Sequence, residues 1–149
     1  MNPIESECHF FVIQDSSGPR SIHLTSLTYS LGRSSKSAIV LPSSSISREH
    51  ALLLRMPSRE PGKYVFRLID GNASGKPSLN GFTVNGEKCA VRDLQDGDRI
   101  IFAEAIEVTY EIKSASKLTP EDAKQTLANA EDEMNTIMNT MLAPNSARV

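Results

Sequence analysis

The stretch TYSLGRSSKSAIVLPSSSISREHALLL, residues 28–54, decides the fold that we expect for this chain. It contains three short apolar runs, at 28–31, 38–41 and 51–54. Serine-rich polar segments separate these runs, and no segment has the length or the 3.6-residue period of a helix. The stretch therefore predicts consecutive short strands that are joined by loops.

The same pattern extends in both directions, over residues 8–113. Further strand-like runs lie at 9–13, 21–24, 64–69, 82–84, 99–102 and 106–112. Asn85 and Gly86 form a two-residue turn of the kind that tolerates positive φ, which favours a tight hairpin. Many short strands with turns between them and no intervening helix are typical of a sandwich. We predict an all-β fold, an antiparallel β-sandwich of about eleven short strands.

The composition changes after this region. We expect a linker at 114–118, an amphipathic helix at 119–143 and a frayed tail at 144–149. Thr119 and Pro120 suit the start of a helix, and apolar residues then recur every three or four positions. This stripe could pack on the sandwich, pair with a second copy as a homodimer, or bind a partner helix.

The net charge, the apolar segments and the cysteine content argue against several classes of protein. A net charge of −2 without a basic run argues against a nucleic-acid partner. No apolar segment approaches the ~20 residues of a membrane span, so we expect no membrane partner. The acidic N-terminus lacks the features of a signal peptide, and the two cysteines suit a reducing compartment. We expect a cytoplasmic protein.

Nothing in the sequence indicates catalysis or a cofactor. Residues 71–76, GNASGK, resemble a nucleotide-binding loop, but the spacing of the glycines is short and Pro77 replaces the required Ser or Thr. The three histidines pair with no nucleophile and carboxylate, and the cysteines have no metal-ligand spacing. We therefore predict that the chain is not an enzyme and has no catalytic residue, metal or cofactor.

Three motifs, in order along the chain, resemble the forkhead-associated (FHA) domain family. They are Gly32-Arg33 at the end of a strand, Ser47-Arg48-Glu49-His50 before the next long strand, and Asn80-Gly81 before the hairpin. The resemblance covers roughly residues 8–113. It implies a β-sandwich that recognises phosphothreonine peptides through loops at one end, as an adaptor in phosphorylation-dependent protein–protein interaction and signalling.

The resemblance also implies roles for single residues. Arg33 would contact the phosphate, Ser47 would donate its hydroxyl to it, and Asn80 would bind the peptide backbone. Arg48 could reach the phosphate or an acidic peptide residue. These roles suit the chemistry, because a guanidinium meets phosphate oxygens in fork geometry and an amide both donates and accepts.

Other motif residues are expected to build the site without touching the ligand. Gly32 and Gly81 would supply backbone freedom, His50 would brace the loops, and Asn85 would form the hairpin turn.

Two departures from the family pattern bear on affinity. Leu79 stands where the family often has threonine, which removes a hydroxyl that is worth roughly 1.5–3 kcal/mol as a hydrogen bond to a charged group. Lys36 and Arg48 are nearby cations that could offset the loss. Residues 70–77 form a longer segment than the family's usual turn, and we expect a mobile loop there. The alternative function is a phosphate-independent structural or oligomerisation protein that uses a degenerate FHA fold and the methionine-rich helix.

Overall fold

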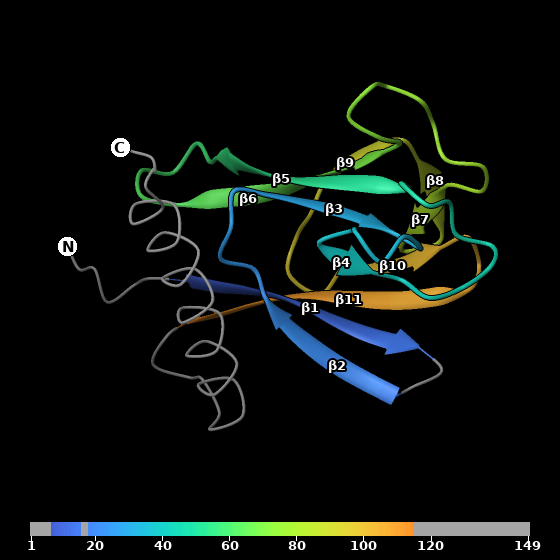
Figure 1. The fold of residues 1–149 in the computed structure, drawn as a ribbon. Helices are drawn as coiled ribbons and strands as arrows, with labels where there is room; N and C mark the ends of the chain where they lie inside the picture. Colours follow the sequence, from blue (N-terminus) through green and yellow to red (C-terminus); the bar gives the residue numbers. More distant parts are fainter. Residues whose placement is uncertain (1–6, 16–17, 115–149) are drawn as a thin grey trace, which may run out of the picture.

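The computed structural model describes residues 7–15 and 18–114. These residues form eleven strands in two sheets (Figure 1). The predicted all-β sandwich is therefore correct for this part of the chain. The helix predicted at 119–143, the linker after Ser114 and the tail at 144–149 lie outside the described residues.

The two sheets contain strands from all parts of the domain. The first sheet has the order β2 (Gly18–His23), β1 (Glu7–Asp15), β11 (Ile106–Ser114), β10 (Arg99–Phe102), β7 (Phe82–Val84) and β8 (Glu87–Cys89). The second has the order β4 (Ile39–Val40), β3 (Thr28–Gly32), β5 (Ala51–Pro57), β6 (Tyr64–Asp70) and β9 (Val91–Asp93).

One strand pair differs from the antiparallel arrangement that we predicted. Leu31 pairs with Ile39 and Gly32 with Val40, so β3 and β4 run parallel. The reason is the path of residues 33–38, which carry the chain back beside β3 before β4 begins, so that β4 repeats the direction of β3. The other described pairs with a printed register are antiparallel.

The hairpin predicted at Asn85-Gly86 is confirmed. Asn85 has φ 52° and Gly86 has φ 87°, and the turn joins β7 to β8. Residues 87–91 do not continue as one strand, because the chain crosses to the other sheet at Ala90. The carbonyl of Ala90 accepts the N–H of Asp70 at 2.8 Å, and β9 then pairs with β6.

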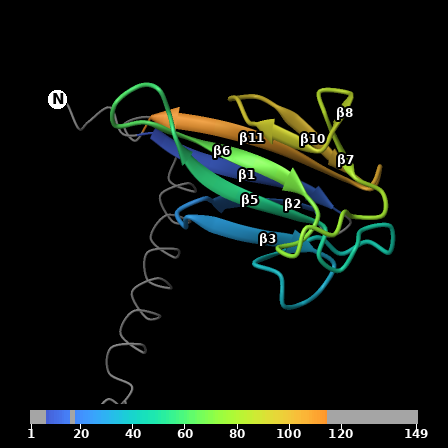
Figure 2. The same cartoon turned by 90° about the horizontal axis from the view of Figure 1, so that it is seen from above.

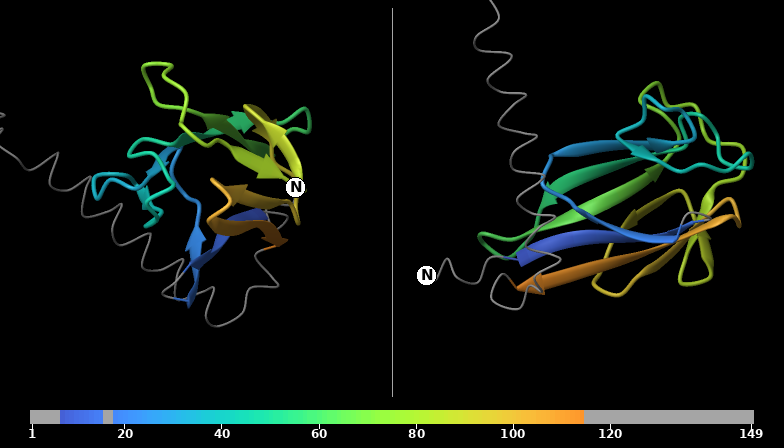
Figure 3. Two further views of the ribbon diagram at one scale, coloured as in Figure 1. Left: turned by 90° about the vertical axis from the view of Figure 1, so that its right-hand side faces the viewer. Right: turned by 60° about the horizontal axis from the view of Figure 1, so that its bottom comes forward.

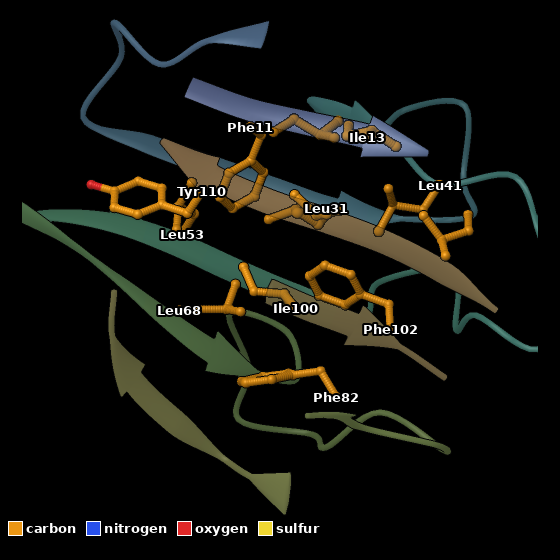
Figure 4. Close-up of a cluster of buried hydrophobic side chains, with 14 of the residues drawn as sticks. Phe11, Ile13, Leu31, Leu41, Leu53, Leu68, Phe82, Ile100, Phe102 and Tyr110 are labelled. Atoms are coloured by element: carbon orange, nitrogen blue, oxygen red, sulfur yellow. The ribbon is translucent and has the colours of Figure 1, made fainter. Parts of the chain in front are cut away.

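The hydrophobic core lies between the sheets (Figure 4). In β5, β6, β7, β10 and β11 buried residues alternate with more exposed ones, as the two-residue period of a strand requires. From the first sheet, β1 contributes Phe11 and β11 contributes Tyr110, whereas β5 and β6 of the second sheet contribute Leu53 and Leu68. Each of these side chains is fully buried, and burying one such side chain stabilises a fold by about 1.5–3 kcal/mol. The core fixes the positions of the strands from which the loops emerge.

The loops that follow β3, β4 and β6 gather at one end of the sandwich, as Figures 2 and 3 show. At the other end, Glu7 at the start of β1 pairs with Ser114 at the end of β11. The described part of the domain therefore begins and ends on neighbouring strands, away from the loop cluster (Figure 1).

His9 is a buried titratable group in the body of the sandwich. Its ring stacks on Tyr64 with centroids 4.4 Å apart, and its Nδ1 bonds to the hydroxyl of Tyr110. Its Nε2 has no hydrogen-bond partner among the described residues. Burial, with the nearby positive charge of Arg55, lowers the pKa of His9 from 6.5 to about 4.

This burial makes the stability of the domain depend on pH. His9 in the unfolded chain binds a proton near pH 6.5, whereas the folded chain resists protonation until the pH is about 4. The contribution of His9 to the free energy of unfolding should therefore be constant above about pH 6.5. It should fall as the pH drops from about 6.5 to about 4. The loss should be at most about 3 to 4 kcal/mol, since each pKa unit corresponds to about 1.4 kcal/mol and the pKa falls from 6.5 to about 4. Urea unfolding at a series of pH values measures this change. In His9→Gln the decline across the window should be smaller, and equal slopes for the two proteins would contradict the assignment.

Candidate functional site

Gly32 allows the chain after β3 to pass against the loop that precedes β5. A Cβ atom built on Gly32 would lie 2.0 Å from the backbone oxygen of Arg48, so only glycine fits. The next residue, Arg33, donates its backbone N–H to Ser47 O and its Nε–H to Ile46 O, both at 3.0 Å. The exposed guanidinium of Arg33 is thus held by Nε, and its terminal nitrogens are the ones that can meet a ligand.

The buried imidazole of His50 joins two loops. Its Nδ1 accepts the backbone N–H of Ser47 at 3.0 Å. The proton of the neutral ring must then be on Nε2, which donates to the carbonyl of Gly81 at 2.8 Å. His50 is 0% exposed, so solvent does not compete for either bond. His50 therefore sets the distance between the loop before β5 and the segment before β7.

Two more hydrogen bonds connect the same segments. The hydroxyl oxygen of Ser47 accepts the backbone N–H of Leu79 at 2.9 Å. The Nδ2 of Asn80 donates to the carbonyl of Ser45 at 2.8 Å. Because the Ser47 oxygen already accepts one bond, its own proton is the group that it can offer to an anion. Asn80 keeps its second amide hydrogen and its Oδ1 for a ligand.

We expected a mobile loop at residues 70–77; Asp70 ends β6, and Asn72 closes the loop that follows with hydrogen bonds. The Oδ1 of Asn72 accepts the backbone N–H groups of Ser74 and Lys76, each at 3.0 Å. Its backbone N–H donates to Lys76 O at 3.0 Å, and its Nδ2 donates to Oε1 of Glu49 at 2.9 Å. Such side-chain closure is typical of asparagine at turns. It attaches this loop to the one that carries Arg48.

A pocket lies between the two loops. One wall is formed by residues of the earlier loops and the other by residues 72–79; the lining residues are Ser34, Ser47, Arg48, Glu49, Asn72, Lys76, Pro77, Ser78 and Leu79. Leu79 is 85% exposed there, although its backbone is fixed by Ser47. A large apolar side chain exposed at the rim of a polar pocket is available for contact with a ligand.

The structure places most of the predicted site residues at this end of the domain. Arg33, Ser47 with Arg48, and Asn80 lie on three hydrogen-bonded loops, which follow β3, β4 and β6. Leu79 donates its backbone N–H to the hydroxyl of Ser47. The supporting residues Gly32, His50 and Gly81 lie directly behind them. Within the described chain, neither Lys36 nor Asn85 lines the pocket.

Asn85 instead braces its own hairpin. Its Nδ2 donates to Asp98 and its Oδ1 accepts the N–H of Arg99, both at 2.9 Å.

Six residues of the pocket lining were not among the predicted site residues: Ser34, Glu49, Asn72, Lys76, Pro77 and Ser78. Asn72 and Lys76 belong to the segment 71–76, which resembles a nucleotide-binding loop. The signal that could have revealed them is the asparagine after Gly71, which favours local side-chain bonding to the backbone. A Cβ on Gly71, whose φ is +100°, would lie 2.6 Å from Lys76 O, so the chain folds back tightly at this point.

The described residues show no sign of a metal centre or a membrane segment. Within residues 7–15 and 18–114, histidine, cysteine and carboxylate side chains do not gather in groups of three or more that could hold an ion. A helix long and apolar enough to span a bilayer is likewise absent from that part of the chain.

A sandwich that carries cations, a hydroxyl and an amide on loops at one end belongs to the class of ligand-binding β-sandwich modules. The family model for the FHA domain matches residues 29–103, which include both loops and the pocket. The chain belongs to the FHA family. FHA domains are interaction modules rather than enzymes, and members of the family bind phosphothreonine peptides in signalling.

Individual relatives agree with this membership. The crystal structure of the Slr1951 protein from Synechocystis sp. is 37% identical, covers 69% of this chain and 96% of that one, and has a TM-score of 0.65. A structure from work on phosphothreonine-dependent FHA domain interactions is 29% identical, covers 70% and 95%, and has a TM-score of 0.55. The sll1895 protein of Synechocystis sp. (strain ATCC 27184 / PCC 6803 / Kazusa) is 35% identical over 123 residues. This match covers 81% of the chain but only 16% of that curated relative.

Replacing His50 by alanine should separate the two loops. The change removes both bonds of the ring and leaves a cavity, so we expect the free energy of unfolding to fall by about 2–5 kcal/mol. Ser44→Ala, an exposed position on the same loop, should change it by no more than about 0.5 kcal/mol. Urea unfolding measures both values. Equal stabilities of the two variants would show that the ring does not hold the loops.

Proposed function

We propose that this domain binds phosphothreonine peptides and acts as an adaptor in phosphorylation-dependent protein–protein interaction. The observation that carries the proposal is the bonded arrangement of Arg33, Ser47 and Asn80 on three loops. His50 holds the loops of Ser47 and Asn80 together, and Arg33 is bonded to Ile46 and Ser47. Arg33, Ser47 and Asn80 each keep a group that a phosphopeptide needs: terminal guanidinium nitrogens, a hydroxyl proton, and an amide. The proposed partner is a phosphothreonine-containing protein in the cytoplasm.

Electrostatics favours the dianionic phosphate over an unmodified hydroxyl. A phosphate at pH 7 carries close to two negative charges and three strong acceptor oxygens. Arg48 and Lys76 line the same pocket as Ser47, and Arg33 donates its backbone N–H to Ser47 O. Glu49 is the one carboxylate in the pocket lining, and its Oε1 accepts a hydrogen bond from Asn72.

Preorganisation supports the same function. The backbone around Arg33 is fixed by its own N–H and by its side-chain Nε before any ligand arrives. Ordering a long side chain on binding costs about 0.5–1.5 kcal/mol, and a side chain that is already held avoids part of that cost. The guanidinium of Arg33 is therefore held in an orientation suited to one binding geometry of the anion.

Arg33→Ala tests the proposal. Wild-type domain should bind a phosphothreonine peptide at least about tenfold more tightly than its unmodified twin, and Arg33→Ala should lose most of that difference, because a charge-assisted contact is worth about 1.5–3 kcal/mol. Calorimetric titration with phosphothreonine, phosphoserine and unmodified peptides measures the affinities. Arg59→Ala, an exposed arginine on the hairpin between β5 and β6, is the matched control and should bind like wild type.

If the unmodified twin binds as well as the phosphopeptide, phosphate recognition is wrong and the phosphate-independent alternative takes its place. That alternative uses the exposed Leu79 as a contact and the segment 119–143 as a dimer or partner-helix interface. Light scattering of the full chain tests its oligomeric part.

Leu79→Thr should strengthen phosphopeptide binding. The change places a hydroxyl beside Ser47, where one added hydrogen bond to a charged group corresponds to about tenfold in affinity. It should cost little stability, because Leu79 is 85% exposed. Leu27→Thr, at a leucine that is 66% exposed and outside the loop cluster, is the control and should leave the dissociation constant unchanged. Unaltered binding by Leu79→Thr would show that the added hydroxyl does not reach the phosphate, and weaker binding would show that the leucine itself contributes to recognition.

A further inference from the structure

The outer face of the first sheet carries an aromatic residue that is as buried as the core. Phe11 and Ile13 of β1 belong to the core, so the two-residue period of the strand directs Phe10 to the opposite, outer face. Phe10 is nevertheless 0% exposed. The outer face of an antiparallel sheet commonly meets water, and an aromatic side chain on it is fully buried only when other atoms lie above the sheet.

His23 is buried in the same way on the neighbouring strand. It is the direct cross-strand partner of Phe10, and the two rings stack with centroids 4.7 Å apart. His23 is only 8% exposed, although its strand, β2, is the edge of the sheet. Lys113 of β11 places its Nζ 5.3 Å from the centroid of the Phe10 ring, and its side chain stays 31% exposed. Side chains that stand beside one another on one face do not cover each other from above, so a further part of the protein covers Phe10 and His23.

The burial of this outer face is centred on one end of the sheet. On β1, Cys8 is half-buried, Phe10 is fully buried, Val12 is half-buried and Gln14 is exposed. On β2 the same decrease runs from the buried His23 towards the start of the strand. The buried end is the end at which β11 finishes, because Glu7 pairs with Ser114 and Cys8 with Lys113. The cover therefore lies where the chain passes from β11 into residues 115–149.

The segment 119–143 has the length and the chemistry to provide this cover. Phe10 pairs with Glu111, which precedes Ser114 by about 10 Å along β11. Residues 115–118 span up to about 13 Å when extended, so the chain can turn back over Phe10. The predicted helix that follows has an apolar stripe rich in methionine, a residue that adapts to irregular apolar surfaces. Phe10 is buried within a single chain, so a second copy is not needed to cover it.

We propose that residues 119–143 dock on the outer face of the first sheet of their own chain, with the apolar stripe against Phe10 and His23. This face lies away from the loop cluster (Figure 1), so the inference goes beyond the proposed function and does not depend on it. Docking leaves the recognition loops open to a ligand. It also occupies the apolar stripe, which is then not available to a dimer or a partner helix.

Cys8 offers a native probe for this contact, because it lies on the outer face next to Phe10 along β1. In full-length chains that carry Cys89→Ser, a second cysteine is placed on the stripe or, as Thr136→Cys, on the opposite side of the predicted helix. The stripe variants are Leu127→Cys, Ala130→Cys and Met134→Cys. A disulfide needs Cα atoms within about 7 Å of each other. At one or more stripe positions the intrachain disulfide should form at least about tenfold faster than in Thr136→Cys, since docking adds to the local concentration that tethering alone provides. Non-reducing electrophoresis of dilute protein measures the rates.

A second measurement leaves the sandwich and both native cysteines unchanged. Met134→Asp places a charge in the stripe, where burying it against the sheet is costly, and should release the segment. Thiol labelling of Cys8 should then become at least about threefold faster, because its local protection is lost. Cys89 on β8, at the opposite edge of the sheet, is the internal reference and should be labelled at an unchanged rate. Thr136→Asp is the matched control and should label like wild type. Thermal unfolding verifies that each variant is folded.

Three results would overturn the docking. One is that the stripe cysteines and Thr136→Cys crosslink to Cys8 at equal rates, as expected of a segment that is tethered but not docked. Another is that the disulfides form between chains, which would place a second copy on this face. The third is that Met134→Asp and Thr136→Asp label alike at Cys8. No phosphopeptide enters these measurements, so the proposed function stands or fails separately from the docking.

Discussion

The imidazole of His50 determines how the two halves of the site face each other. It accepts from Ser47, which precedes a strand of one sheet, and donates to Gly81, which precedes a strand of the other. A neutral histidine offers one donor and one acceptor on opposite sides of a rigid ring, so the width of that ring fixes the separation of the loops. With the ring fully buried, breaking either bond would leave a polar group without water.

Other hydrogen bonds of the site depend on the position of this ring. Ser47 lies close enough to Leu79 for a hydrogen bond, and Asn80 reaches Ser45, because the backbones on either side are held at a set distance. Arg33 depends on the same loop, since Ile46 and Ser47 accept its two bonds. Arg33, Ser47 and Asn80 are therefore held at set positions relative to one another.

Sequence patterns predicted the parts of this structure that depend on local geometry. The turn at Asn85-Gly86 follows from residues that tolerate positive φ. For Gly32 we expected a need for backbone freedom, but its φ is not positive; glycine is needed there because Arg48 O lies too close for a Cβ, which depends on the fold. The parallel pair of β3 and β4 was not predictable in this way, because it depends on the path of the connecting loop. The same holds for Lys76, whose place in the pocket results from a bond between Asn72 and Glu49, which lie 23 residues apart in the chain.

Glu7 and Ser114 are paired on adjacent strands, at the end of the sandwich away from the loop cluster. When a domain begins and ends on neighbouring strands, it can be inserted into another protein, because the two connections to that protein lie close together. In the curated relative, the matching region occupies 16% of the length. This geometry allows the sandwich to be inserted into a larger protein with its loop cluster on the side away from the two connections.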